Sequence, residues 1–101
     1  MQAEIYTKDM CPYCVKAKEL LRELNIDYVE YKISAGLDES TLEKNQFYVT
    51  KADLLEKLPT ARTVPQIWID GEHVGGFDNL CAMHASGQLD KLMGKINLPI
   101  K

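Results

Sequence analysis

The run Cys11-Pro12-Tyr13-Cys14 constrains the fold more than any other feature, because it joins a strand-forming segment to a helix-forming one. Alternating residues predict a strand over Ala3–Thr7, and apolar residues at helical spacing predict a helix from Pro12 to about Asn25. Cys11 therefore falls at the helix N-terminus. Pro12 takes the first helical position, where its missing N–H costs nothing and its fixed φ is already helical.

The spacing of the two thiols favours redox chemistry, since cysteines three residues apart can close into a disulfide and reopen. Unpaired N–H groups and the helix dipole stabilise a thiolate at the helix N-terminus. One helical face is predicted to be buried and carries Cys14, Ala17, Leu21 and Leu24. We therefore expect Cys11 to lie at the exposed tip and attack substrates, and Cys14 to resolve the mixed disulfide.

Length and composition indicate one compact domain over residues 1–101. We expect this domain to be a monomer. The net charge of -3 offers no basic patch, which argues against nucleic-acid and membrane partners. Three cysteines do not form a disulfide framework, and no apolar segment resembles a signal peptide or membrane span. We expect a cytoplasmic protein, because a reducing compartment suits a catalytic cysteine pair.

A zinc site is an alternative interpretation of the cysteine pair. Cys81 and His84 offer a second pair of ligands at suitable spacing. Zinc modules usually bring both ligand pairs close together in sequence, whereas these pairs lie far apart in a chain long enough to fold without metal. We therefore expect no metal and a packing role for Cys81.

Period-two alternation predicts a second strand over Tyr28–Ile33, parallel to the first because a helix connects them. A capping box at Ser40–Glu43 and a helix start at Thr50 predict that the following segment is helical. Phe47–Val49 lies between these starts, so one kinked helix or two short ones remain open.

The sequence of the last third of the chain predicts a β-hairpin followed by a helix. Gln66–Ile69 and Glu72–Val74 flank Asp70-Gly71, a strong two-residue turn. Asp78 is predicted to cap a helix over Asn79–Ser86, whose N-terminus can bind an anion. A short amphipathic tail follows, with Leu89, Leu92, Met93 and Ile96.

With the element order β-α-β-α-β-β-α, the chain resembles a glutaredoxin. The resemblance is carried by Lys8, the Cys11–Cys14 run, Thr63-Val64-Pro65 and Gly75-Gly76-Phe77-Asp78. It implies an α/β thioredoxin-like fold, with a four-stranded mixed sheet, flanking helices and a cis bond before Pro65. In Gly-Gly-Phe-Asp and in its long middle segment the chain looks more like phage-type members than like short bacterial ones.

The resemblance implies that glutathione is the reducing co-substrate and that disulfide-containing proteins are the substrates. Glutathione would lie over Tyr13 and pair with Val64, in the Thr63-Val64-Pro65 segment. The remaining contacts would come from Lys8 and Arg62 at its glycine carboxylate, and from Gly76, Phe77 and Asp78 at its γ-glutamyl end. A phage-type member would donate electrons to ribonucleotide reductase.

Two further alternatives remain. A redoxin fed by thioredoxin reductase would use the same cysteine pair. An iron–sulfur scaffold would bridge subunits through Cys11 and glutathione, but family members that hold clusters commonly have glycine where this chain has Pro12.

Overall fold

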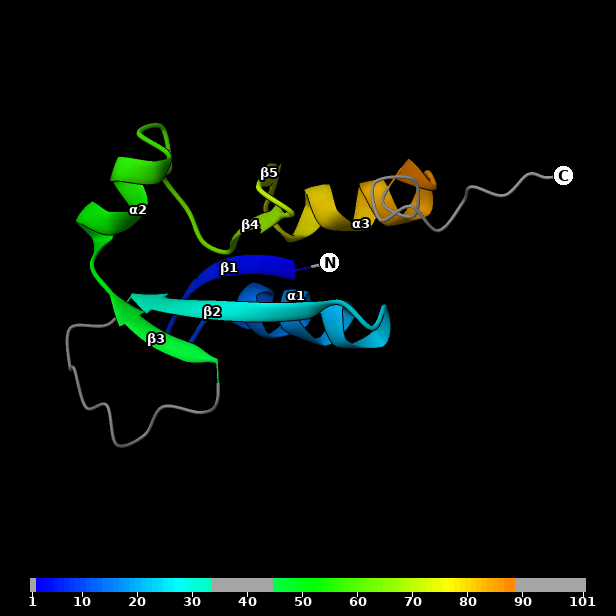
Figure 1. Cartoon of the computed structure of the whole chain (residues 1–101), viewed down its shortest axis with the longest axis horizontal. Helices are drawn as coiled ribbons and strands as arrows, with labels where there is room; N and C mark the ends of the chain where they lie inside the picture. The colour runs from blue at the N-terminus through cyan, green and yellow to red at the C-terminus, as the bar shows by residue number, and fades with distance from the viewer. Residues whose placement is uncertain (1, 34–44, 89–101) are drawn as a thin grey trace, which may run out of the picture.

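The computed structural model describes residues 2–33 and 45–88. These residues form a mixed sheet of five strands, in the order β3-β2-β1-β4-β5, with three helices (Figure 1). The elements are β1 (Gln2–Lys8), α1 (Pro12–Glu23), β2 (Asp27–Ile33), β3 (Gln46–Val49), α2 (Lys51–Lys57), β4 (Gln66–Ile69), β5 (Glu72–Gly75) and α3 (Phe77–Ala85). The capping box predicted at 40–43 and the tail predicted at 89–96 lie outside the described residues.

The sheet confirms the predicted βαβ unit, because β1 and β2 pair in parallel. Strand β4 pairs antiparallel with β1, and β5 returns antiparallel to β4 through a turn at Asp70 and Gly71. Both turn residues have positive φ, 51° and 84°, which the predicted Asp-Gly turn requires.

Of the two arrangements left open around Phe47–Val49, one continuous kinked helix is wrong, and neither arrangement included a strand there. These residues form β3, which pairs in parallel with β2 at the sheet edge and raises the strand count from four to five. Their β-prone side chains find a partner strand there, and the Phe47 ring stacks on Tyr31 at 6.1 Å. The predicted helix start at Thr50 is confirmed, since its hydroxyl and Asp53 form a capping box at α2.

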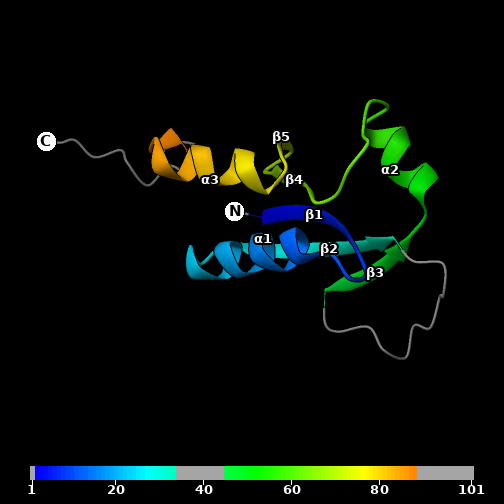
Figure 2. The same ribbon diagram turned by 180° about the vertical axis from the view of Figure 1, so that it is seen from behind.

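The two faces of the sheet carry separate cores. Helices α1 and α3 cover one face, and α2 covers part of the other; Figure 2 shows α2 set apart from α1 and α3. The first core contains Ala3, Ile5, Ala17, Leu21, Ile26, Ile67, Ile69 and Leu80. Because Ala17 and Leu21 belong to this core, the buried face of α1 predicted from the sequence is confirmed.

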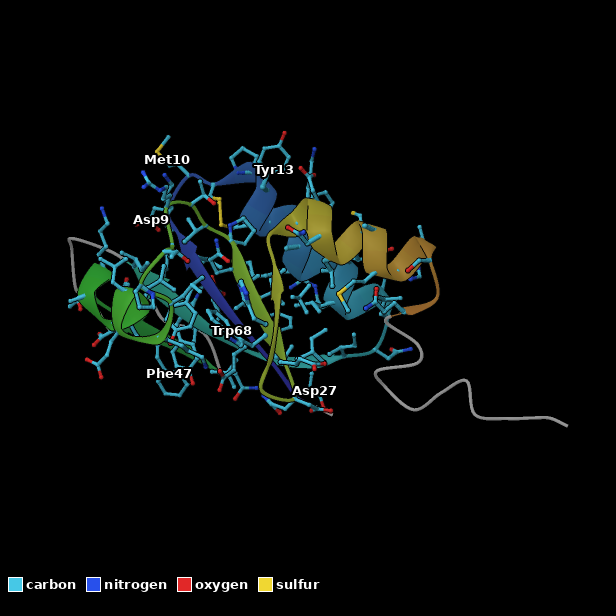
Figure 3. All side chains as sticks on the ribbon, turned by 90° about the horizontal axis from the view of Figure 1, so that it is seen from above. Asp9, Met10, Tyr13, Asp27, Phe47 and Trp68 are labelled. Atoms are coloured by element: carbon cyan, nitrogen blue, oxygen red, sulfur yellow. A yellow bond between two sulfur atoms is a disulfide. The ribbon has the colours of Figure 1, made fainter. Side chains whose placement is uncertain are left out.

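An aromatic row crosses the second face, with one ring from each strand. Neighbouring ring centroids lie 4.8 to 6.1 Å apart along the row His73, Trp68, Tyr6, Tyr31 and Phe47. Such ring pairs stabilise the folded protein by more than the burial of their apolar surface alone. Figure 3 shows Trp68 and Phe47 on this side of the molecule, while Met10 and Tyr13 lie at the beginning of α1.

Candidate active site

Cys11 and Cys14 form a disulfide at the N-terminus of α1. Cys11 is the N-cap residue, and its sulfur accepts a hydrogen bond from the backbone N–H of Cys14 at 3.3 Å. Pro12 occupies the first turn as predicted. A reduced Cys11 therefore has a backbone donor and the positive end of the helix dipole beside its sulfur, and both favour the thiolate.

The expected exposure of Cys11 was wrong for the disulfide form. Cys11 is 8% exposed and Cys14 is 2% exposed, so both are buried. The loop before β4 covers Cys11, because the carbonyl oxygen of Val64 lies 3.8 Å from its Sγ. Exposed apolar side chains surround the pair instead: Met10 is 98% exposed and Tyr13 57%.

A groove of about 740 Å³ adjoins the cysteine pair, within the usual size range of a small-molecule site. Its wall is built from the first turn of α1, the loop before β4, and the junction of β5 with α3. It includes the predicted residues Tyr13, Thr63, Val64, Pro65, Gly76, Phe77 and Asp78. The Val64–Pro65 peptide bond is cis, as the resemblance implied.

The two predicted cations line a neighbouring recess rather than the groove itself. Lys8 and Arg62 are both exposed and border a cavity of about 210 Å³ together with Lys51. Thr63 and Val64 belong to the walls of both cavities. The structure therefore brings the whole predicted set to one side of the cysteine pair, in two adjoining parts.

The capping role predicted for Asp78 was wrong. Helix α3 begins at Phe77 with Gly76 as N-cap, and Asn79 Oδ1 accepts a hydrogen bond from the Gly76 N–H at 3.2 Å. Asp78 lies in the first turn with an exposed side chain. Gly75 permits this arrangement: its φ is +116°, and a Cβ there would lie 2.7 Å from Asn79 Oδ1.

A buried ion pair near the cysteines was not predicted. Glu30 is 5% exposed, and Lys18 Nζ lies 3.1 Å from each of its carboxylate oxygens. Thr7 Oγ1 donates to the same carboxylate at 2.6 Å and Gln46 Nε2 at 3.0 Å. One signal in the sequence points to it: Glu30 follows Tyr28 by two positions in a predicted strand, so both side chains lie on the same face, which α1 covers.

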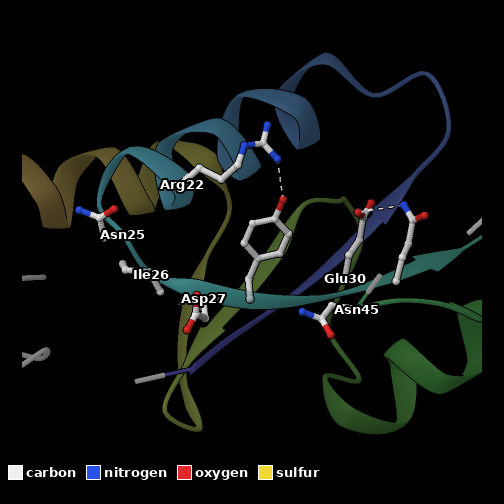
Figure 4. A pocket seen from close by; sticks show the side chains of 8 residues that line it. Arg22, Asn25, Ile26, Asp27, Glu30 and Asn45 are labelled. Atoms are coloured by element: carbon white, nitrogen blue, oxygen red, sulfur yellow. Dashed lines mark hydrogen bonds between the residues drawn. The ribbon is translucent and has the colours of Figure 1, made fainter. Parts of the chain in front are cut away.

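Glu30 also borders another cavity, of about 400 Å³, which Figure 4 shows from close by. Arg22 Nη1 donates a hydrogen bond to the Tyr28 hydroxyl at 2.7 Å across this cavity. The cavity lies along α1, β2 and β3, and the cysteines are not part of its wall.

Cys81 is a free thiol with intermediate exposure on α3, and His84 is exposed. Among residues 2–33 and 45–88, no group of three or more His, Cys, Asp or Glu side chains is placed to hold a metal ion. No helix in the same residues is long and apolar enough to cross a membrane.

A cysteine pair at the N-terminus of a helix, facing a cis-proline loop in a thioredoxin-like fold, defines a thiol–disulfide oxidoreductase. The family model for glutaredoxins matches residues 3–74. The chain is 44% identical to "Glutaredoxin 1" of Rickettsia conorii over 88% of its own length and 78% of the relative's. It is 39% identical to "Glutaredoxin 3" of Escherichia coli K12 over 89% and 94%.

A solved structure described as a buckwheat glutaredoxin–glutathione complex is similar in fold. Its TM-score to this chain is 0.63 at 28% identity, covering 92% of this chain and 76% of the buckwheat one. The family match and the bacterial relatives together show that the chain belongs to the glutaredoxin family, with Cys11 and Cys14 as its redox pair.

Proposed function

We propose that the chain is a glutathione-dependent oxidoreductase that reduces protein disulfides and glutathione mixed disulfides. The observation that carries this proposal is the groove of about 740 Å³ beside Cys11. The loop before β4, the junction of β5 with α3 and two aromatic rings line this groove. The Tyr13 and Phe77 rings lie 6.1 Å apart in its wall. A tripeptide could lie over these rings and pair its backbone with Val64. The similar buckwheat glutaredoxin is described in complex with glutathione, which supports this co-substrate.

The charges around the groove match those of glutathione, which carries two carboxylates and one ammonium group. Lys8 and Arg62 would attract the glycine carboxylate. The first N–H groups of α3, a helix that begins after Gly76, would bind the γ-glutamyl carboxylate. Asp78, exposed in the first turn of α3, would pair with the γ-glutamyl ammonium group.

Catalysis would proceed by two disulfide exchanges. The Cys11 thiolate attacks one sulfur of the substrate disulfide, forming a mixed disulfide and releasing the other sulfur as a thiolate. Cys14 then attacks Cys11 Sγ, giving its proton to solvent and releasing the reduced substrate. One glutathione thiolate then attacks Cys11 Sγ, forming a mixed disulfide and releasing Cys14. A second glutathione attacks the glutathione sulfur of that mixed disulfide, releasing the Cys11 thiolate and oxidised glutathione.

A low pKa at Cys11 would help departure more than attack. A thiol of pKa about 8.5 is roughly 3% ionised at pH 7, so lowering the pKa to about 5 raises the thiolate fraction roughly thirtyfold. With a Brønsted slope of about 0.4–0.5, the same lowering of the pKa makes each thiolate attack more slowly, by a factor similar to the gain in thiolate fraction. The two effects on attack therefore nearly cancel. The advantage appears when glutathione attacks the mixed disulfide, because a stabilised Cys11 thiolate leaves readily.

We further propose ribonucleotide reductase as the first protein acceptor to test, and the cytoplasm as the compartment, because a glutathione cycle requires a reduced thiol pool. The chain would act as a monomer of one domain without a metal.

A coupled assay tests the reductant. We expect NADPH consumption with glutathione and glutathione reductase, in the presence of a disulfide substrate. Consumption with thioredoxin reductase alone, and none with glutathione, would replace this proposal with the thioredoxin-reductase-fed alternative.

A further inference from the structure

The Lys18–Glu30 ion pair lies against the redox site but has no part in the exchanges described above. Lys18 follows Cys14 by about one turn of α1. Cys14, Lys18 and Glu30 all line one cavity of about 470 Å³, whose wall also contains Cys11. The ion pair and the cysteine pair therefore share one cavity wall, where the charges of Lys18 and Glu30 face the same space as Cys14.

Lys18 alone would stabilise a Cys14 thiolate, because a neighbouring ammonium group lowers the pKa of a thiol. Glu30 opposes that effect, since its two carboxylate oxygens both lie 3.1 Å from Lys18 Nζ. A close pair of opposite charges has a much weaker field than a single charge. Burial of Cys14, which is 2% exposed, then favours its neutral form.

We propose that Glu30 neutralises Lys18 so that Cys14 keeps its proton when the disulfide is reduced, which makes Glu30 a positioning residue for the cysteine pair. Reduction breaks the S–S bond with two electrons from the reducing thiols. One proton goes to Cys14 Sγ, and Cys11 Sγ remains a thiolate stabilised at the helix N-terminus. The proposal concerns the dithiol chemistry itself and does not depend on which thiol is the reductant.

Direct proton transfer from Cys14 to Glu30 is a weaker explanation. An ordinary glutamate is about four pKa units more acidic than an ordinary thiol, so the transfer is unfavourable by about four orders of magnitude. Glu30 also already accepts hydrogen bonds from Thr7, Lys18 and Gln46. Neutralisation of Lys18 requires no proton movement and uses the contacts that the structure has.

The other charged groups on the cavity wall do not replace this pair. Lys8, Asp9 and Lys32 line the same cavity. Lys32 Nζ lies 2.7 Å from Asp9 Oδ1, so these two charges also oppose each other. Lys8 is exposed to solvent, which screens its charge.

A protonated Cys14 would attack Cys11 slowly at neutral pH. The mixed disulfide on Cys11 would therefore survive long enough to meet an external thiol. Glu30 would in this way favour exchange with small thiols over rapid closure of the internal disulfide.

Titration of Cys14 tests the proposal. In a Cys11→Ser, Cys81→Ala background Cys14 is the sole thiol of the chain, and its ionisation is followed by thiolate absorbance. We expect Glu30→Gln to lower its pKa by about one unit, a tenfold gain in thiolate. Lys18→Met should raise the pKa, and the double variant should titrate close to the parent.

A kinetic measurement supplies a second readout in the chain that keeps both active-site cysteines. The Cys11 thiol is first converted to a thionitrobenzoate mixed disulfide, and Cys14 then releases the coloured thiol. Tenfold more Cys14 thiolate, offset by lower nucleophilicity, should make release about threefold faster in Glu30→Gln near neutral pH. Lys18→Met should slow it.

Opposite shifts by the two single variants support the proposal, since loss of structure alone would not move the pKa in opposite directions. An unchanged Cys14 pKa in Glu30→Gln, or shifts of the same sign in both variants, would overturn it. Thermal unfolding by circular dichroism checks each fold. If Glu30→Gln does not fold, Lys18→Met and the double variant decide, and a lower pKa in Lys18→Met overturns the proposal.

Discussion

Cys11 Sγ lies 3.8 Å from the carbonyl oxygen of Val64, although the two residues are 53 positions apart in the chain. Strand pairing creates this contact, because β1 leads into the cysteine loop and β4 follows the Val64 loop, and the two strands are antiparallel neighbours. A substrate sulfur that reaches Cys11 therefore meets the backbone of the cis-proline loop at the same point. The redox centre is thus built from two loops at one end of adjacent strands.

Replacing the two active-site cysteines one at a time should separate their roles. We expect Cys11→Ser to abolish all thiol transfer, because Cys11 occupies the N-cap position that stabilises a thiolate. Cys14→Ser should still reduce glutathione mixed disulfides but lose reduction of protein disulfides. Assays with one substrate of each kind measure this difference. Equal loss in both variants on a small glutathionylated substrate would contradict the assignment.

Asp78 should affect glutathione binding more than helix stability, because it is exposed and does not cap α3. For Asp78→Asn we expect an apparent KM for glutathione raised by up to about fivefold, the effect of losing one exposed ion pair of up to about 1 kcal/mol. Steady-state kinetics with varied glutathione measure it.

Asn79→Ala is the stability control for Asp78→Asn, and because Asn79 also lines the groove only its free energy of unfolding is compared. It removes the side chain that accepts from the Gly76 N–H and should lower the free energy of unfolding by about 1 kcal/mol. If Asp78→Asn destabilised the fold as much as Asn79→Ala without changing the KM, Asp78 would not bind glutathione.

The Lys8 and Arg62 side chains should act together on an anionic co-substrate. Each is exposed, so Lys8→Gln and Arg62→Gln should each raise the apparent KM for glutathione by up to about fivefold, and added salt should reduce the difference from the parent. Arg22→Gln is the control, because Arg22 lines a separate cavity beside Tyr28 whose wall contains neither Lys8 nor Arg62. A KM that rises equally in Arg22→Gln would indicate a general charge effect rather than a binding recess.

Tyr6 should make the fold sensitive to alkali. Its burial, followed by the neighbouring Glu4 charge, raises its pKa above the usual 10.0. The folded state thus favours the neutral phenol, so stability is fully present below about pH 10 and falls as the pH rises through the folded pKa, by up to about 1.4 kcal/mol per pH unit. Tyr6→Phe should remove this part of the loss.

Urea unfolding at pH 8 and at pH values above 10 measures the Tyr6 effect. A Cys81→Ala background is used, because a free thiolate would exchange with the disulfide in alkali. The hydrogen bond to Asp9 raises the pKa of Lys32, so deprotonation of Lys32 at high pH also lowers the stability of the fold. Lys32 is present in both proteins, so this part of the loss is the same in each. An identical alkaline loss in Tyr6→Phe would contradict the prediction.

Local sequence determined those parts of the protein that depend on neighbours in the chain. The start of α1 at Pro12, the Thr50 cap of α2 and the Asp70-Gly71 turn each follow from hydrogen bonds or backbone angles within a few residues. The parallel pairing of β1 and β2 follows from the helix that connects them. The cysteine pair itself identified the chemistry.

The tertiary structure decided what depends on distant partners. Phe47–Val49 becomes a strand because β2 offers an unpaired edge, which local propensity does not reveal. Cys11 is buried because the Val64 loop covers it. Glu30 is buried because donors from β1, α1 and β3 surround its carboxylate, and each comes from a different part of the chain. A charge can be buried only where such partners converge, and their convergence is a property of the folded sheet.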